Sequence, residues 1–259
     1  MELKDILYDK RDHIATITMN RPDRLNALGG ALSQSMDTAF RDADADAETR
    51  VIVLTGAGRG FCAGLDMRDN AAGPGGGRKI PAFRGSSMAR LILNTNKPTI
   101  AAVNGAAVGW GFELALLCDF RIAAEEARLG DIHVKRGLVQ DNGLNFTLPR
   151  LIGWSRACEV LLTGDLFSAK DCERMGIVNK VVPAEGLKAA TDELAHKLAA
   201  NAPLAVQMTK RIARAGTRME LDDALDYSML TMWSLFGTED VKEGFKAFAE
   251  KREPRFSGQ

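Results

Sequence analysis

The sequence predicts an α/β fold that ends in an all-helical region. Short apolar runs with strand-like patterns alternate with helical patterns through the first 200 residues. From residue 204 to about residue 251 only helical patterns remain, with a turn near Gly237 and Thr238. The length of 259 residues suits one large domain with a small appendage. We therefore expect a core over 1–200 and a C-terminal helical region over 201–259.

The N-terminal half is expected to hold most of the strands. Residues 13–19 alternate apolar and polar side chains, which is typical of a half-buried strand. The run 51–55 is continuously apolar and ends at Gly56, as in a strand that is buried on both faces. The expected elements are strands at 6–8, 13–19, 51–55 and 98–103, helices at about 30–45 and 81–94, and glycine-punctuated loops at 58–64 and 104–111.

The C-terminal half is expected to be mainly helical. A helix is predicted to begin near Phe112, after which 119–123 has the composition of a strand. The polar, glycine-bounded segment 130–143 is expected to be irregular. Helical patterns then resume at about 143–150, 155–162, 168–175, 184–200 and 204–251.

Composition argues against several classes of protein. The 34 basic and 34 acidic residues balance, so we expect no nucleic acid as the main partner. The four cysteines form no CxxC pair and no histidine sits at metal-ligand spacing, so we expect reduced thiols and no metal. The N-terminus lacks an apolar signal core, and no apolar run is long enough for a membrane span. We therefore expect a cytoplasmic protein with no membrane partner.

Two glycine-containing loops are the first candidates for chemistry. Each follows a predicted strand and precedes a helix, at 60–66 and at 104–113. Backbone N–H groups at a helix start lack intrahelical partners and can donate to an anion. Two such donors facing one oxygen would stabilise a developing enolate, although a loop of this kind can also be only a tight turn.

The combined motifs closely resemble the crotonase superfamily, the enoyl-CoA hydratase/isomerase family. The resemblance runs through nearly the whole chain, in order and with the family's spacing. The segments that carry it are Asn20-Arg21-Pro22, Leu25-Asn26-Ala27-Leu28, Phe61-Cys62-Ala63-Gly64-Leu65-Asp66, Lys97-Pro98-Thr99-Ile100-Ala101-Ala102-Val103-Asn104-Gly105, Gly109-Trp110-Gly111-Phe112-Glu113-Leu114-Ala115, Leu162-Thr163-Gly164, Gly176-Ile177-Val178-Asn179 and Glu243-Gly244-Phe245-Lys246-Ala247-Phe248.

The resemblance implies a fold, an assembly and a binding site. The fold is the crotonase spiral of repeated strand-strand-helix units, with C-terminal helices that form a homotrimer or a dimer of trimers. Leu65 and Trp110 would supply the oxyanion-hole N–H groups, although the family usually has a small residue where Trp110 stands. No separate cofactor is expected, because coenzyme A is part of the substrate. The positions that would contact it are Arg24, Leu25, Ala27, Ala63, Asp66, Arg68 and Lys251, of which Arg68 and Lys251 could equally be solvated surface charges.

Three side chains are candidates for acid–base catalysis. Glu113 matches one of the two catalytic glutamates of the hydratases, although a helix dipole alone also favours Glu in a first turn. The second hydratase glutamate is replaced by His133, which could act near neutral pH or simply line the pocket. Asp141 stands where dienoyl-CoA isomerases carry a proton-shuttling Asp, although an Asp there could also be a helix N-cap.

These residues predict chemistry on an acyl-CoA thioester through a stabilised enolate, with Asp141 and Glu113 as acid and base. Hydration would use a water held between Glu113 and His133, whereas isomerisation would use the Asp141–Glu113 pair. A third alternative is nucleophilic attack by Asp141, as in a chlorobenzoyl-CoA dehalogenase of the family. A non-catalytic protein that binds acyl-CoA or RNA is a fourth, and the basic helix at 210–218 is the segment that RNA would need.

Overall fold

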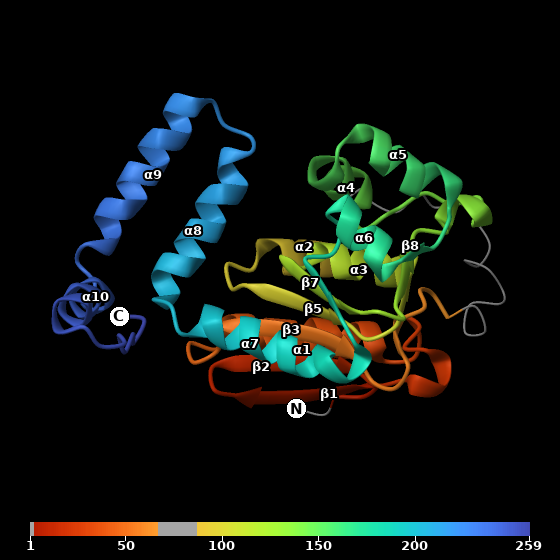
Figure 1. The fold of residues 1–259 in the computed structure, drawn as a ribbon, viewed down its shortest axis with the longest axis horizontal. Helices are drawn as coiled ribbons and strands as arrows, with labels where there is room; N and C mark the ends of the chain where they lie inside the picture. Colours follow the sequence, from red (N-terminus) through yellow and green to blue (C-terminus); the bar gives the residue numbers. More distant parts are fainter. Residues whose placement is uncertain (1–2, 67–86) are drawn as a thin grey trace.

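Among the residues that the computed structural model describes, 3–66 and 87–259, ten strands form two sheets (Figure 1). The larger sheet has the strand order β1-β2-β3-β5-β7-β10. β1 and β2 form an antiparallel hairpin, and the other neighbouring strands pair in parallel. Its strands are β1 (Ile6–Arg11), β2 (Ile14–Met19), β3 (Val51–Gly56), β5 (Thr99–Val103), β7 (Phe120–Ala124) and β10 (Lys180–Val182).

The smaller sheet lies at the end of the larger one and has the order β4-β6-β8-β9. Its strands β4 (Gly60–Cys62), β6 (Ala106–Val108), β8 (Arg128–Gly130) and β9 (Phe167–Ser168) have two or three residues each. The prediction that 58–64 and 104–111 are loops was therefore wrong at their centres. A strand of three residues is too short to show an alternating pattern in sequence.

The two sheets repeat one unit along the chain. β3 and β4, β5 and β6, and β7 and β8 each place one strand in the large sheet and the next in the small sheet. A helix follows each pair: α2 (Ser87–Asn94), α3 (Trp110–Leu117) and α4 (Leu144–Ile152). This arrangement is the predicted strand-strand-helix spiral. α3 begins two residues before the predicted start at Phe112, and the predicted residues 81–86 of the preceding helix lie outside the described part of the chain.

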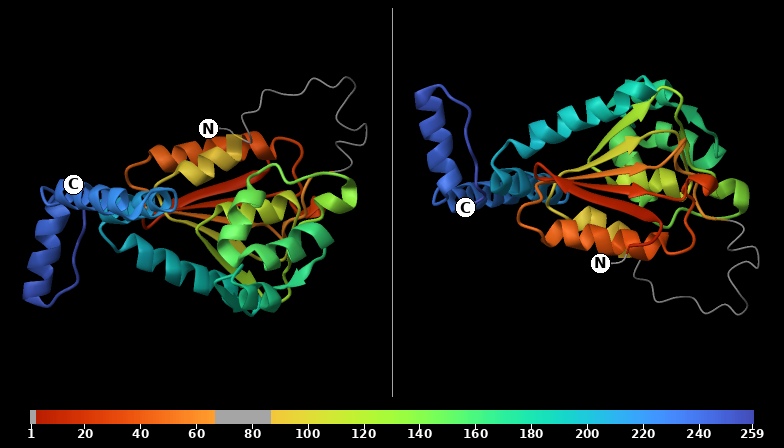
Figure 2. Two further views of the ribbon diagram at one scale, coloured as in Figure 1. Left: turned by 90° about the horizontal axis from the view of Figure 1, so that it is seen from above. Right: turned by 90° about the horizontal axis from the view of Figure 1, so that it is seen from below.

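Helices cover both faces of the large sheet, as Figure 2 shows. α1 (Leu32–Ala45) and α2 lie on one face, where Ile17, Ile52 and Leu54 are buried with Met36 and Phe40 of α1. α7 (Leu187–Ala199) covers the opposite face over Val51, Val53 and Ile100. Both faces of the central strands are therefore buried, which explains why residues 51–55 are continuously apolar.

The remaining helices form two groups (Figure 1). α4, α5 (Trp154–Thr163) and α6 (Ala169–Met175) lie beside α3, near the small sheet. α8 (Pro203–Gly216), α9 (Leu221–Leu235) and α10 (Glu239–Glu250) extend away from the core. No helix in the described parts of the chain combines the length and apolar character that a membrane crossing needs.

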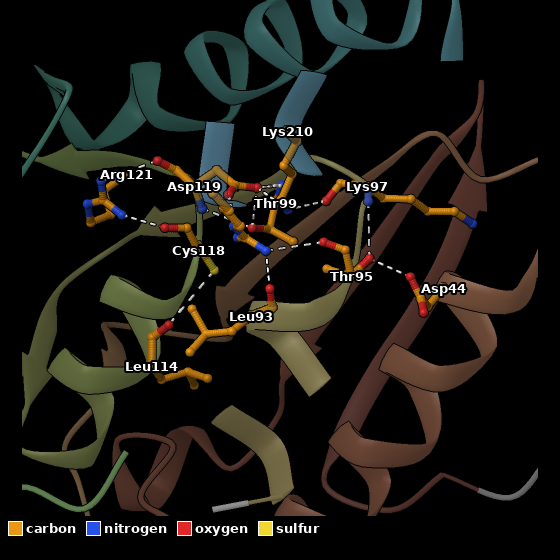
Figure 3. A network of polar contacts seen from close by, with 11 residues as sticks. Asp44, Leu93, Thr95, Lys97, Thr99, Leu114, Cys118, Asp119, Arg121 and Lys210 are labelled. Atoms are coloured by element: carbon orange, nitrogen blue, oxygen red, sulfur yellow. Dashed lines mark hydrogen bonds and ion pairs between the residues drawn. The ribbon is translucent and has the colours of Figure 1, made fainter. Parts of the chain in front are cut away.

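Two cations of α8 contact one carboxylate of the core, that of Asp119, as well as nearby backbone carbonyls (Figure 3). Lys210 of α8 donates to it at 2.5 Å, and Arg214 donates at 2.8 Å. Thr99 of β5 donates to the same carboxylate through its backbone N–H and its hydroxyl. Two of the cations in the basic helix therefore face the protein, which argues against this helix as a continuous RNA-binding stripe.

Candidate active site

Two loops at the ends of paired strands bring the predicted N–H donors together. β4 leads into Gly64 and Leu65, and its neighbour β6 leads into Gly109 and Trp110. Because β4 and β6 run parallel, both loops leave the same end of the small sheet. A Cβ atom on Gly64 would lie 2.9 Å from the carbonyl oxygen of Val108 and 3.8 Å from the backbone nitrogen of Trp110. The close approach of the two loops therefore requires a glycine at residue 64.

The N–H groups of Leu65 and Trp110 are placed differently from those that build the fold. The N–H of Leu28 donates to the carbonyl of Gly64 at 2.7 Å, and the N–H of Asp66 donates to the carbonyl of Leu28 at 2.8 Å. Since successive N–H groups alternate in direction along an extended chain, that of Leu65 faces away from Leu28. Trp110 is the first residue of α3, where an N–H has no helical acceptor. A backbone N–H must be placed in one of these ways to donate to a bound ligand instead of to another group of the protein.

Glu113 is a buried carboxyl in the first turn of α3, with only 1% of its surface exposed. Asn142 donates to both of its oxygens, from the backbone N–H to Oε1 at 3.2 Å and from the side-chain amide to Oε2 at 2.9 Å. Burial raises the pKa of Glu113, and the hydrogen bonds from Asn142 and the charge of His133 oppose that rise. A carboxyl that holds its proton more tightly than usual is suited to donating that proton near neutral pH.

His133 lies at the start of a 3-10 helix, His133–Arg136, directly after the small sheet. Its Nδ1 is hydrogen-bonded to the carboxylate of Asp131, which is fully buried. A Cβ atom on Gly109 would lie 3.8 Å from Cε1 of His133. The imidazole therefore borders the loop that carries Trp110.

Asp141 is an exposed carboxylate beside Glu113. Its Oδ1 accepts a hydrogen bond from the side-chain amide of Asn142 at 2.7 Å. α4 has Gly143 as its N-cap, with no capping side chain. Asp141 is therefore not the helix cap that its sequence position also allowed.

Glu113, His133 and Asp141 form one group, which we call the acid–base cluster. One side-chain N or O atom of each lies within 4.8 Å of those of the other two. Three ligands at this spacing could also hold a metal ion, but Asn142 already donates to both carboxylates. The arrangement therefore favours acid–base chemistry over metal coordination.

Comparison with known proteins identifies the family. The family profile described as Enoyl-CoA hydratase/isomerase matches residues 9–259. The chain belongs to the enoyl-CoA hydratase/isomerase family. It is 37% identical to the short-chain-enoyl-CoA hydratase of Clostridium acetobutylicum over 254 residues, and this alignment covers 97% of each chain.

Two further relatives of this enoyl-CoA hydratase/isomerase family member are informative. The (E)-benzylidenesuccinyl-CoA hydratase of Thauera aromatica is 40% identical over 256 residues, which is 98% of this chain and 99% of that one. The crystal structure of an enoyl-CoA hydratase from Bacillus anthracis superposes with a TM-score of 0.92 at 36% identity, over 99% of this chain and 100% of that one. The family and the crotonase fold predicted from the sequence motifs are therefore confirmed.

The family's predicted CoA loop packs against the first donor loop. Leu25 has the left-handed φ of 49°, and its carbonyl accepts from the N–H of Ala63 at 3.0 Å. Arg24 is exposed at the loop surface, whereas Ala27 is buried. The carboxylate of Asp66 is buried and paired with Arg21 at 3.1 Å, so Asp66 stabilises the loop pair through its side chain.

Of the two predicted phosphate contacts, only Lys251 lies in the part of the chain that the structure describes. Arg68 falls outside the described residues. Lys251 is exposed at the C-terminal end of α10. α10 lies at the opposite end of the molecule from the small sheet that carries the donor loops (Figures 1 and 2). A single chain therefore does not bring Lys251 to the predicted CoA loop.

Sequence reasoning missed two residues of this site. Asp131 was not singled out, although its position two residues before His133 was visible. Asn142 was not among the predicted catalytic or binding residues, yet its amide connects Glu113 and Asp141. The proximity of Asn142 to Asp141 in sequence gave no indication that it also contacts Glu113, 29 residues away.

Proposed function

We propose that this protein binds the thioester of an acyl-CoA and adds water across the adjacent carbon–carbon double bond, or removes water in the reverse direction. The observation that carries the proposal is the acid–base cluster beside the two donor loops. Glu113 and Trp110 lie in the first turn of the same helix, and Gly109 of that loop borders His133. One bound thioester could thus meet N–H donors and proton-transferring side chains together.

The thioester oxygen would accept hydrogen bonds from the N–H groups of Leu65 and Trp110. Charge develops on this oxygen when the double bond is attacked, so donors placed there lower the barrier more than they strengthen substrate binding. One such donor contributes about 2.7–4 kcal/mol to transition-state stabilisation. The glycine at residue 64 supports this assignment, because it allows the two loops to approach each other.

The attacking water would be held between Glu113 and His133. Two groups that each contact one water at about 2.8 Å, at a tetrahedral angle, lie about 4.6 Å apart. The acid–base cluster, with its atoms within 4.8 Å of one another, matches this requirement. The water oxygen bonds to Cβ and its proton passes to His133, while the π electrons move toward the thioester oxygen. The resulting enolate takes a proton from Glu113 at Cα, which completes the addition of water.

Double-bond isomerisation is the second candidate reaction, and the position of Asp141 favours it. Its carboxylate lies in the same cluster and shares the Asn142 amide with Glu113. Asp141 would remove a proton from the activated carbon to give a dienolate, and Glu113 would return a proton at another carbon. Asp141 would be the base in this reaction, whereas His133 would be the base in hydration.

One experiment separates the two reactions. The protein is incubated in heavy water with crotonyl-CoA and, separately, with a dienoyl-CoA, and the products are analysed by mass spectrometry and NMR. Formation of a hydroxyacyl-CoA from crotonyl-CoA supports hydration. Deuterium incorporation with movement of the double bond supports isomerisation. If neither substrate changes while both bind, the proposed catalytic function is wrong.

We also propose that the protein assembles as a homotrimer or as a dimer of trimers through its C-terminal helices. α9 and α10 expose large apolar side chains, including Leu230, Trp233 and Phe248 at 70%, 64% and 86%. Exposed apolar side chains gathered on two helices are typical of a protein interface and support this proposal. Assembly would also give Lys251 a role, because its ammonium could reach the CoA phosphates bound to another copy. Sedimentation velocity, with Phe248→Asp as the disrupting variant, tests this proposal.

A further inference from the structure

Asp131 is a fully buried carboxylate between β8 and the 3-10 helix that begins at His133. One of its oxygens is bonded to Nδ1 of His133. The other oxygen accepts from the side-chain amide of Gln140. Both oxygens of this carboxylate are therefore engaged by neighbouring side chains.

This pairing determines which nitrogen of His133 carries the proton. A buried carboxylate without a donor is strongly disfavoured, so the neutral imidazole places its hydrogen on Nδ1. Nε2 then has a lone pair and can accept a proton. The same relationship between a buried carboxylate and an imidazole sets the tautomer of the catalytic histidine in serine proteases.

The residues around His133 explain why this tautomer would matter for catalysis. The imidazole belongs to the acid–base cluster with Glu113 and Asp141 and borders Gly109 of the second donor loop. With Nδ1 occupied by Asp131, Nε2 is the ring nitrogen left to contact a water in the cluster. A positive imidazolium formed there would also be stabilised by the charge of Asp131.

We infer that Asp131 is a positioning residue that holds His133 in the Nδ1–H tautomer, so that Nε2 serves as the base for water. Gln140 holds the second oxygen of Asp131 and so restricts rotation of the carboxylate. This inference rests on the proposed hydration reaction. It explains how a site with histidine in place of a second glutamate can still activate water.

The first test is the tautomer itself, which does not depend on activity. The sequence has three histidines, so selective nitrogen-15 labelling gives a simple NMR spectrum in which His133→Asn assigns the signal of interest. We expect protonated Nδ1 and unprotonated Nε2 for the neutral ring of His133. The opposite tautomer would overturn the inference even if the protein proves to be an active hydratase.

The second test is Asp131→Asn. The introduced amide can present either its carbonyl oxygen or its N–H₂ group to His133, so the tautomer is no longer fixed, and the negative charge opposite a developing imidazolium is lost. An imidazole that accepts from this N–H₂ group must carry its proton on Nε2, where it cannot accept one from water. We expect kcat for hydration to fall about 10³-fold with KM changed by less than about 3-fold. A kcat within about 3-fold of wild type would overturn the inference.

A compensating variant separates positioning from simple loss of structure. In Asp131→Asn combined with Gln140→Glu, the introduced carboxylate accepts from the N–H₂ group of the introduced amide, whose carbonyl oxygen then turns toward His133. The double variant should regain at least about 10-fold in kcat over Asp131→Asn alone and restore the Nδ1–H signal. Failure of both to recover in a folded double variant contradicts the positioning role.

Two controls complete the experiment. Asp240→Asn changes another buried carboxylate, one that accepts from Ser257 and Gly258 in the C-terminal tail, and should leave kcat and the His133 signal unchanged. Wild-type protein that binds crotonyl-CoA but never hydrates it would show that the proposed function is wrong. The NMR result would in that case still decide the tautomer.

Discussion

Asn142 is hydrogen-bonded to both carboxylate oxygens of Glu113, one through its backbone N–H at 3.2 Å and the other through its side-chain amide at 2.9 Å. The same amide donates to Asp141 at 2.7 Å. These bonds stabilise the charged form of Glu113, whereas burial favours the neutral form. Asn142 therefore limits how far the pKa of Glu113 rises.

Replacing Asn142 with alanine should raise the pKa of Glu113 further. The side-chain donor is lost, so the charged carboxylate loses stabilisation while its burial is unchanged. If Glu113 must be protonated to act, the high-pH limb of the kcat profile should move to higher pH. Asn145→Ala is the matched control, because the Asn145 amide donates to the backbone carbonyl of Gln140 and not to a carboxylate of the described residues. A profile that shifts equally in both variants would contradict this role for Asn142.

Glu113→Gln should reduce kcat about 10³-fold, because an amide cannot donate a proton to carbon as a carboxylic acid does.

The same substitution should increase the free energy of unfolding at high pH. Since burial raises the pKa of Glu113 in the folded state, its contribution is fully present below the unfolded-state pKa. It is lost as pH rises through the folded-state pKa, where a charge must be buried.

The variant should therefore gain free energy of unfolding relative to wild type as the pH rises. Urea unfolding at about pH 5 and about pH 8 measures this difference. Glutamine does not titrate, so the gap should be larger at the higher pH. A gap that shrinks with pH would mean that Glu113 is ionised at little cost in the folded protein.

Gly64→Ala should reduce kcat about 10²-fold, because the new methyl group would press on the carbonyl of Val108 and displace the N–H of Leu65. Gly176→Ala is the matched control. Both glycines have positive φ, 96° and 86°, but a Cβ at Gly176 meets nothing within 4 Å. Both variants should lose about 1 kcal/mol of stability from backbone strain, and only Gly64→Ala should lose activity. Equal activity in the two variants would remove the donor-loop contact from the mechanism.

Asp141→Asn should abolish isomerisation and leave CoA binding intact. Asparagine keeps the shape of the side chain and the acceptor for Asn142, but it cannot take a proton from carbon. Deuterium exchange at the substrate carbons and the Kd for a saturated acyl-CoA, measured by calorimetry, separate the two effects. Full isomerase activity in this variant would exclude Asp141 as the base.

Asp119→Asn should destabilise the attachment of α8 to the core. Lys210 and Arg214 would lose their shared carboxylate, and Lys210 is only 11% exposed. We expect a loss of about 2 kcal/mol in the free energy of unfolding. Asp165→Asn, which breaks the exposed pair with Lys135, should change the free energy of unfolding far less. Equal losses from the two substitutions would show that the α8 ion pairs add little.

The sequence by itself determined the fold class and the position of the site along the chain. Apolar periodicity is a local property, so the long strands β2 and β3 and the helix α1 were predictable from their own residues. The glycines of the donor loops were also visible in the sequence, since few residues other than glycine allow two backbones to approach closely. The family motifs then predicted Glu113, His133 and Asp141 together.

Only the tertiary structure decided how these residues meet. The short strands β4 and β8 form through pairing with distant strands. A run of three residues is too short to show an alternating apolar pattern in the sequence. The bonds from Asn142 to Glu113 and from Asp131 to His133 depend on where the segment 130–143 folds against α3. Hydrogen bonds between side chains act only over about 3 Å, so no local pattern in the sequence records which donors will face which carboxylates.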